Sequence, residues 1–358
     1  MARWSHPAVV ALSAVRSMED RAAATRRIDA RVVGVERILE AASAALGEQV
    51  SRPIDLGGST RSSVLRCVTA DGGTVVVKAY QDAVGFAAEV AGLPLGGGYG
   101  PRLLAVDPSF PLVVMSDLGA APSLADVLLG ESAREAREGL LTWARTYGRI
   151  AVAGAGRQDE WERSRAAHAE DGSGWRPFRD ASDLAEVLPL APPGLDGELA
   201  ELVASYGRYR VFSPGDICPD NNLLTADGMR VLDFEGSGYH SAFLEAAYVR
   251  MPFATCWCVF RLPSGLAAEI EAAYRKEVIA VHPDLADDRL WETGVRLAMV
   301  TWTIHMTWVL LPRARKRDRP MHHTRTPVPS ERQLLRYRWS RLLAELDRDG
   351  SGFAAGPG

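Results

Sequence analysis

Asp216, Asn221 and Asp233 lie close together in the stretch VFSPGDICPDNNLLTADGMRVLDFEG. Asp216 and Asn221 belong to a run rich in turn-forming residues, and Asp233 follows a short apolar run typical of a strand. Oxygen ligands suit a hard cation such as Mg²⁺, and a neutral amide adds one without adding negative charge. A carboxylate beside such an ion can orient a hydroxyl group and accept its proton. We therefore expect Asn221 and Asp233 to bind magnesium and Asp216 to act as a general base.

The spacing of these residues favours the chemical interpretation over a structural one. The loop from Asp216 to Asn221 is long enough to turn back on itself, so that both side chains face one cavity. A turn at Asp227 and Gly228 returns the chain to Asp233. In the structural alternative, Asp216 is a turn residue and Asp233 caps a strand.

A second group of candidate residues lies far upstream. Lys78 lies in the apolar run TVVVKAY, where an unpaired charge is costly to bury, and Glu89 lies in the short helical segment GFAAEVAGL. Phosphate oxygens and the Glu89 carboxylate would both stabilise this lysine. A flexible turn before it can bring backbone amides close to phosphates. The residues of this turn, called the phosphate loop below, are Gly57, Gly58, Ser59 and Thr60.

Taken singly, these upstream features have ordinary explanations. A Gly-Gly turn usually closes a hairpin, and a lysine near a strand end usually reaches water. Their order along the chain is more specific: a Gly-rich turn, a lysine, a helical glutamate, then G-D-x4-N followed by D-F. Transfer of the terminal phosphoryl group of ATP depends mainly on positioning and charge neutralisation, which this set of residues can provide. We therefore expect ATP and Mg²⁺ as cofactors.

The elements that must position these residues divide into a small sheet and a helical region. Residues 53–80 predict an antiparallel meander of three strands, and RLLAV and PLVVM add two more. After Met115 the pattern is mainly helical. The fold class expected is therefore α+β, with two lobes: a small antiparallel five-stranded N-lobe with one helix, and a large, mainly helical C-lobe.

The same patterns suggest domain boundaries. The expected parts are a helical N-terminal extension at 1–48, the N-lobe at 49–117, the C-lobe at 118–345 and a flexible tail at 346–358. Within the C-lobe, residues 157–193 are polar and poorly periodic, and residues 313–325 predict a basic loop that contains proline. A last amphipathic helix follows Ser330, a candidate N-cap.

Composition limits the partners and the compartment. The chain has 358 residues, is 47% hydrophobic and carries a formal net charge of −4, so it can build a core and has no overall attraction to nucleic acid or membrane. We expect a cytoplasmic protein without disulfides, because four irregularly spaced cysteines make no framework and no signal sequence precedes them. Cys256 and Cys258 in TCWC are better explained as buried thiols than as metal ligands. The apolar run from 295 to 311 is better explained as a core helix than as a bilayer span.

From about Ile54 to Pro252, the chain resembles the aminoglycoside phosphotransferase family, which has the protein-kinase-like fold. The motifs that carry the resemblance are the phosphate loop, Lys78, Glu89, VVMSDLG, GDICPDN and LDFEG. The resemblance implies that Asp216 is the catalytic base, that Asn221 and Asp233 bind magnesium and that Lys78 contacts the α and β phosphates. It further implies a nucleotide-binding linker, with backbone contacts to adenine from Ser116 to Leu118. The linker residues assigned to the nucleotide are Met115, Ser116, Asp117 and Leu118.

Three positions differ from the family pattern or need comment. The family's loop usually begins His-Gly-Asp, whereas this chain has Pro214 before Gly215, so the loop must be braced in another way. Ser116 stands where an acidic residue is common, but recognition of adenine by main-chain atoms should tolerate it. Glu245 stands where the family usually has a structural aspartate that opens a helix.

The acceptor is the least determined feature. The leading expectation is a hydroxyl group of a small molecule, either an antibiotic or a biosynthetic intermediate. A Ser or Thr of a peptide precursor is an alternative acceptor, and a non-catalytic nucleotide-binding module is an alternative function. A basic loop at 313–325 beside the cleft would favour an anionic, aromatic or peptide acceptor over a polyamine, whereas a solvated loop far from the site would say nothing. His322 and His323 are expected at the surface, and the oligomeric state is left open.

Overall fold

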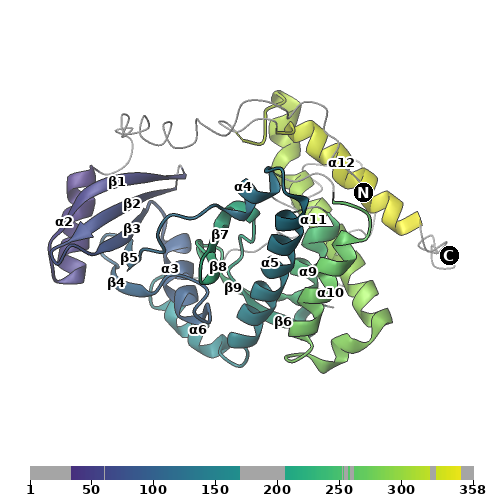
Figure 1. The fold of residues 1–358 in the computed structure, drawn as a ribbon, viewed down its shortest axis with the longest axis horizontal. Helices are drawn as coiled ribbons and strands as arrows, with labels where there is room; N and C mark the ends of the chain where they lie inside the picture. Colours follow the sequence, from purple (N-terminus) through teal and green to yellow (C-terminus); the bar gives the residue numbers. More distant parts are fainter. Residues whose placement is uncertain are drawn as a thin grey trace.

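The computed structural model describes residues 34–59, 61–169, 206–251, 253, 257–258, 262–322 and 328–347. These residues form a sheet-based N-lobe and a larger, mostly helical C-lobe, at the left and right of Figure 1. The predicted fold class is confirmed. Residues 1–33, Thr60, most of the polar segment after 169, Cys256, His323 and the tail from 348 lie outside the described part.

The N-lobe is built on one antiparallel sheet. Its strands are β1 (Val50–Ser59), β2 (Ser62–Thr69), β3 (Thr74–Tyr80), β4 (Leu103–Asp107) and β5 (Leu112–Ser116). The spatial order is β1-β2-β3-β5-β4, and all neighbouring pairs are antiparallel. The five predicted strands are therefore present, and the pairing of β3 with β5 places the strand that carries Lys78 at the centre of the sheet.

Two helices cover the two faces of this sheet. Helix α2 (Val35–Leu46) buries Ile38 and Ala42 against one face. Helix α3 (Ala83–Gly92) places Phe86 and Val90 against the other face. Asp82 caps α3, because its carboxylate accepts the first free N–H groups of the helix. Helix α3 is the predicted helix that carries Glu89.

The C-lobe surrounds the loops of the predicted site. Its helices are α4 (Leu124–Leu128), α5 (Ala133–Ala153), α6 (Gln158–Ala166), α9 (Ala242–Arg250), α10 (Leu266–Val278), α11 (Asp288–Lys316) and α12 (Glu331–Asp347). Strands β6 (Arg210–Ser213) and β9 (Gly238–Ser241) form one short sheet, and β7 (Asn222–Thr225) and β8 (Gly228–Val231) form another. The predicted hairpin that leads to Asp233 is β7–β8.

Helix α11 extends further than the sequence suggested. It runs through Pro312 to Lys316, so the prediction of a loop beginning at residue 313 is wrong for residues 313–316. Proline usually ends a helix because it lacks an N–H group. Here Leu310 and Ala314 pack against Leu334 of α12, and this contact supports the last turns.

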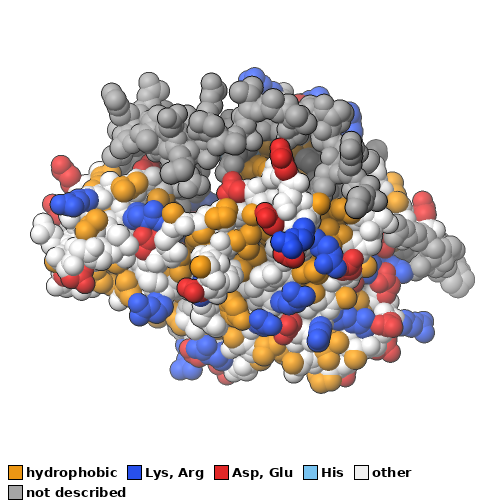
Figure 2. All heavy atoms as spheres, in the orientation of Figure 1, with side chains coloured by type: hydrophobic (Ala, Val, Ile, Leu, Met, Phe, Trp, Pro, Cys, Tyr) orange, Lys and Arg blue, Asp and Glu red, His pale blue; other side chains and the backbone are white. Residues whose placement is uncertain are grey.

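The apolar run from 295 to 311 lies within α11, and its helical, largely buried state is confirmed. In the described part of the chain, α11 is the one helix long and apolar enough to cross a membrane. More than half of its most apolar window is buried inside the protein. Figure 2 shows acidic and basic side chains mixed over the displayed face, without a dominant area of one sign among the described residues.

Candidate active site

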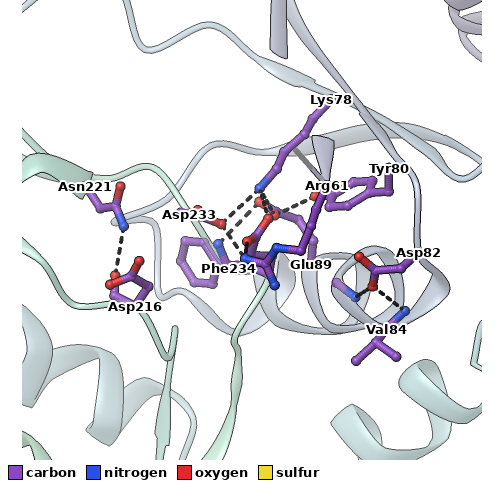
Figure 3. A network of polar contacts seen from close by, with 12 residues as sticks. Arg61, Lys78, Tyr80, Asp82, Val84, Glu89, Asp216, Asn221, Asp233 and Phe234 are labelled. Atoms are coloured by element: carbon purple, nitrogen blue, oxygen red, sulfur yellow. Dashed lines mark hydrogen bonds and ion pairs between the residues drawn. The ribbon is translucent and has the colours of Figure 1, made fainter. Parts of the chain in front are cut away.

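Lys78 lies at the centre of a cluster of carboxylates (Figure 3). Its Nζ atom is 2.8 Å from Glu89 Oε2, 2.9 Å from Asp233 Oδ1 and 3.0 Å from Glu235 Oε2. The Tyr80 hydroxyl also donates to Glu89, at 2.6 Å. The lysine side chain is only 7% exposed, so these carboxylates replace water as its partners. The predicted pair of Lys78 and Glu89 is thus in contact, and Asp233 and Glu235 join it from the C-lobe.

The titration of this cluster follows from burial and from charge. Burial alone would lower the pKa of Lys78, but the three carboxylates outweigh it and hold that pKa above its usual value. Burial would raise the pKa of Asp233, but Lys78, the Glu235 backbone N–H and Arg61 hold it below its usual value. Burial raises the pKa of Glu89, while Lys78 opposes that shift. We treat Glu89 as ionised, because it accepts hydrogen bonds from Lys78 and Tyr80.

Helix α3 is tied to the segment that follows Asp233. The Phe234 N–H donates to Glu89 Oε1 at 3.3 Å, and the Ser237 hydroxyl donates to the Ala88 carbonyl at 2.6 Å. The Phe234 ring is buried against the Gly96–Gly100 turn after α3. These contacts join the two lobes directly behind Lys78.

Asp216 is brought to Asp233 by a close approach of two glycines. Gly215 has a φ of +94°, and a Cβ atom there would lie 2.0 Å from the Gly236 carbonyl oxygen. Only glycine allows this backbone shape and this contact. The side chain of Asp216 faces solvent, yet partial desolvation and the nearby Asp233 raise its pKa to about 6. The residues 215–221, called the catalytic loop below, therefore lie against the Asp233 segment.

Asn221 lies at the other end of the catalytic loop. Its Nδ2 atom donates to the Asp216 backbone carbonyl at 3.2 Å, and the Leu232 N–H donates to the Asn221 carbonyl at 2.9 Å. Its Oδ1 atom accepts no hydrogen bond from a described residue. In Figure 3, Asn221 and Asp216 lie together on one side of Asp233, and Lys78 lies on the other. The structure thus brings together Asp216, Asn221, Asp233, Lys78 and Glu89.

The catalytic loop is braced by residues that sequence reasoning missed. The Trp143 indole N–H donates to the Ile217 carbonyl at 3.1 Å, and Asn222 Nδ2 donates to the Cys218 carbonyl at 2.6 Å. The Tyr147 hydroxyl donates to Asn222 Oδ1 at 2.9 Å. Trp143, Tyr147 and Asn222 are all buried. They supply the bracing that Pro214, in place of the usual histidine, was expected to require. The signal in the sequence was an Asn directly before the apolar run of β7.

Glu245 lies behind the same loop, on α9. Its side chain is buried, and burial raises its pKa to about 7. The hydroxyls of Ser213 and Tyr274 lie near enough to favour the charged form, but neither carboxylate oxygen has a hydrogen bond of proper geometry among the described residues. The helix itself opens with Ser241, whose hydroxyl accepts the Phe243 N–H. Glu245 therefore does not cap this helix.

The phosphate loop lies at the tip of the β1–β2 hairpin. Gly57 and Gly58 both have positive φ, and a Cβ atom on Gly58 would lie 2.4 Å from the Ser62 carbonyl oxygen. Ser59 ends β1, and Thr60 lies outside the described residues.

Two charged residues that received no role from sequence reasoning connect this tip to the C-lobe. Arg61 Nη2 is 2.8 Å from Glu235 Oε1. The sequence signals for a role were the position of Arg61 directly after Thr60 and the position of Glu235 within LDFEG.

The linker between the lobes begins in β5. Met115 is buried in the cluster that includes Phe86, and the Ser116 N–H donates to the Arg102 carbonyl at 2.9 Å, within the sheet. The Asp117 carboxylate pairs with Arg66 and accepts the Gly119 N–H. The N–H of Ser116 is therefore already used within the sheet.

Trp257 connects the catalytic loop to the basic segment. Its indole N–H donates to Asp220 Oδ2 at 3.0 Å, and its ring centroid lies 4.7 Å from that of His322. The His322 end of the basic segment is therefore connected to the catalytic loop through Trp257. His322 is half-buried, with its ring against Trp257.

A separate cavity of about 980 Å³ lies between α9, α10, α11 and α12. Arg250 lies in its wall, paired with Glu271 and Glu292 at 2.6 Å each. None of the predicted site residues lines this cavity. The convergence of charged groups around Lys78, and not the size of this cavity, identifies the candidate active site.

No protein-family model matches the sequence, and no curated protein matches it. Solved structures do match. An ethanolamine kinase from Plasmodium vivax is 13% identical, with a TM-score of 0.51, and the match covers 83% of this chain and 81% of that chain. A choline/ethanolamine kinase family protein from Mesorhizobium loti is 16% identical, with a TM-score of 0.48 and coverage of 83% and 88%.

A thermostable mutant of the aminoglycoside phosphotransferase APH(4)-Ia, in a ternary complex with ADP and hygromycin B, is also similar. It is 14% identical, with a TM-score of 0.47 and coverage of 89% of this chain and 100% of that chain. At identities this low, similarity establishes the fold alone. The likeness to the Plasmodium enzyme shows that this chain has the fold of the protein-kinase-like phosphotransferases, as the sequence motifs implied.

Proposed function

We propose that this chain is an ATP- and Mg²⁺-dependent phosphotransferase that transfers the γ-phosphoryl group to a hydroxyl of a small molecule. The observation that carries the proposal is the contact of Lys78 with both Glu89 and Asp233, with Asp216 beside Asp233. A buried lysine between two lobes and two adjacent carboxylates matches the requirements of phosphoryl transfer. The fold shared with the Plasmodium ethanolamine kinase supports the same reaction class.

The residues present fit a magnesium nucleotide. Lys78 and the main chain at Gly57 and Gly58 would hold phosphates, and Asn221 and Asp233 offer oxygens of the kind that Mg²⁺ prefers. Glu89, Asp233 and Glu235 each offer an oxygen within 4.8 Å of one another, but Lys78 lies among them. We therefore assign the metal to the side of Asp233 that faces Asn221. Bound ATP would supply the transferable phosphoryl group, and bound Mg²⁺ would neutralise negative charge on the phosphates.

The side chains of the chain itself divide the remaining work. Asp216 orients the acceptor hydroxyl and accepts its proton, and a pKa of about 6 leaves it mostly ionised at neutral pH. Lys78 balances negative charge on the phosphates, and Glu89 holds the lysine in place. Trp143 and Asn222 fix the carbonyl groups of the catalytic loop, so that Asp216 keeps one position.

The acceptor side favours a neutral or anionic molecule over a polycation. The basic segment 313–322 is connected to the catalytic loop at its His322 end, through Trp257. Four cations in this segment are exposed, and none forms an ion pair with a described residue. They are Arg315, Lys316, Arg317 and Arg319. Such a surface repels an aminoglycoside and attracts carboxylates or phosphates.

The alternatives differ in what they require. A peptide acceptor with acidic residues also fits the basic segment and is tested in the same screen. A non-catalytic nucleotide-binding module would not need Asp216, and the presence of the full set of charged residues argues against it. A cytoplasmic location and the absence of a nucleic-acid partner remain predictions from the sequence.

Thermal unfolding with and without ATP and Mg²⁺ tests the nucleotide site. Wild type should gain about 2.7 kcal/mol of stability at a ligand concentration 100 times the dissociation constant. Asp233→Asn should lose the part of this gain that depends on magnesium, whereas Asp227→Asn, an exposed residue of the β7–β8 turn, should keep it. No gain in wild type, or a gain indifferent to magnesium, would contradict the proposal.

A screen for the acceptor completes the test. Hydroxyl-bearing metabolites, antibiotics and peptides, each grouped by charge, are incubated with ATP and examined by mass spectrometry for the gain of one phosphate. We expect neutral or anionic small molecules to be modified and aminoglycosides not to be. Modification of peptides alone would replace the small-molecule acceptor with a peptide.

A further inference from the structure

Arg61 is held in position by its main chain, while its side chain extends into solvent toward the other lobe. Its carbonyl accepts the Gln81 N–H at 2.8 Å, which fixes the hairpin tip against the end of β3. The side chain is 66% exposed and reaches Glu235 in the C-lobe. An exposed pair of this kind contributes roughly 0–1 kcal/mol, so its exchange for another partner costs little.

Glu235 pairs with two cations at once. One carboxylate oxygen lies 2.8 Å from Arg61 Nη2, and the other lies 3.0 Å from Lys78 Nζ. The same lysine is the expected phosphate ligand, and Arg61 also lies near enough to Asp233 to influence its charge. The Glu235 carboxylate thus occupies the place where an anionic group can contact both cations, as a phosphate would.

Even with magnesium at Asp233, the charge balance of the cluster favours a further cation when phosphates bind. Glu89, Asp233 and Glu235 already outnumber Lys78, and nucleotide phosphates add further negative charge. Arg61 directly follows the phosphate loop, and its planar fork can bind two phosphate oxygens together.

We propose that Arg61 is a nucleotide-binding residue that pairs with the terminal phosphate, and that Glu235 holds its guanidinium in the absence of nucleotide. This inference rests on the proposed function, because it takes the Lys78 cluster as the phosphate site. Arg61 exchanges Glu235 for the phosphate when the nucleotide enters.

Calorimetric binding of AMP-PNP and AMP, both with Mg²⁺, tests the role of Arg61 without reference to turnover. In Arg61→Ala, the affinity for AMP-PNP should fall roughly tenfold or more, the scale of a lost charge-assisted hydrogen bond, while the affinity for AMP stays unchanged. Arg61→Lys should be intermediate. The control is Arg134→Ala, because Arg134 is an exposed arginine of α5 paired only loosely with Glu138.

The outcomes separate this inference from the proposed function. Wild type that fails to bind AMP-PNP overturns both. Wild-type affinity for AMP-PNP in Arg61→Ala, or an equal loss for AMP, overturns the role of Arg61 alone.

A second measurement tests whether Glu235 competes with the nucleotide phosphate for Arg61. With EDTA present, so that metal binding does not enter, Glu235→Gln should bind AMP-PNP several-fold more tightly than wild type. Part of the gain should disappear when Arg61→Ala is added, because the two residues act on each other, whereas the part that acts through Lys78 should remain. A gain of the same size in the double variant would contradict the exchange.

Discussion

Gly215 and Gly236 touch through their backbones, at the point where the catalytic loop meets the segment after Asp233. A Cβ atom added to Gly236 would meet its neighbours at ordinary van der Waals distances, whereas one added to Gly215 would lie 2.0 Å from the Gly236 carbonyl oxygen. This contact determines how closely Asp216 approaches Asp233. The distance between the proposed base and the proposed metal ligand is therefore set by the backbone and not by long side chains.

Gly215→Ala should separate the two loops. We expect a loss of roughly 3 kcal/mol or more in the free energy of unfolding, because strain at positive φ adds to a clash with rigid backbone. Gly228→Ala is a matched control, with a φ of +105° and no atom within 4 Å of the added Cβ. It should cost only about 1 kcal/mol. Urea unfolding of both variants measures the difference, and equal losses would show that the contact with Gly236 is unimportant.

Asp216→Asn should retain nucleotide binding but reduce phosphoryl transfer by roughly a hundredfold or more, the usual scale for a positioned base. In wild type, kcat/KM should fall as the pH drops below about 6, because Asp216 must be ionised to accept a proton and its pKa is raised to about 6. The residual activity of Asp216→Asn should not show this fall in kcat/KM below about pH 6. Equal turnover in the variant, or the same acidic limb in its pH profile, would remove Asp216 from the proposed role.

Lys78→Met should destabilise the protein more than Glu89→Gln does. Removal of the lysine leaves Glu89 and its carboxylate neighbours without their shared cation, at a cost of about 3–5 kcal/mol. Glu89→Gln leaves Lys78 with Asp233 and Glu235 as partners, so about 1–2 kcal/mol is expected. Urea unfolding of both variants measures the two losses in the free energy of unfolding. A larger cost for Glu89→Gln would contradict the prediction that Asp233 and Glu235 still stabilise Lys78 when Glu89 is replaced.

Glu245 should make stability depend on pH. Its pKa is raised from 4.5 to about 7 in the folded state, so the folded state binds more protons between these values than the unfolded state. Stability should therefore fall as the pH rises from about 4.5 to about 7, by up to about 3 kcal/mol. Glu245→Gln should lack this part of the slope and be more stable than wild type at pH 8. Parallel stability profiles for the two proteins would mean that Glu245 is not desolvated.

The sequence was informative where chemistry and local pattern agree. The β-branched apolar run around Lys78 and the apolar neighbours of Glu89 predicted the strand and the helix that meet in the Lys78–Glu89 pair. The turn residues before Asp233 predicted the β7–β8 hairpin. These features depend on a few neighbouring residues, so local rules suffice.

Features made by distant packing could not be predicted in the same way. Arg61 and Glu235 are 174 residues apart, and nothing in either neighbourhood indicates the other. The bond from Trp143 to the Ile217 carbonyl depends on where α5 passes the catalytic loop. The extension of α11 beyond Pro312 depends on α12, because tertiary contacts outweigh the local preference against proline.

Helix α3 is fastened at its Glu89 side chain and its Ala88 carbonyl to the chain just after Asp233. Kinases that are switched on and off commonly do so by moving the corresponding helix and its glutamate away from the lysine. Such a movement here would strip Phe234 and Ser237 of their partners at the same time. In the proposed function, loss of the Lys78–Glu89 pair would therefore have to break these two links between the lobes as well.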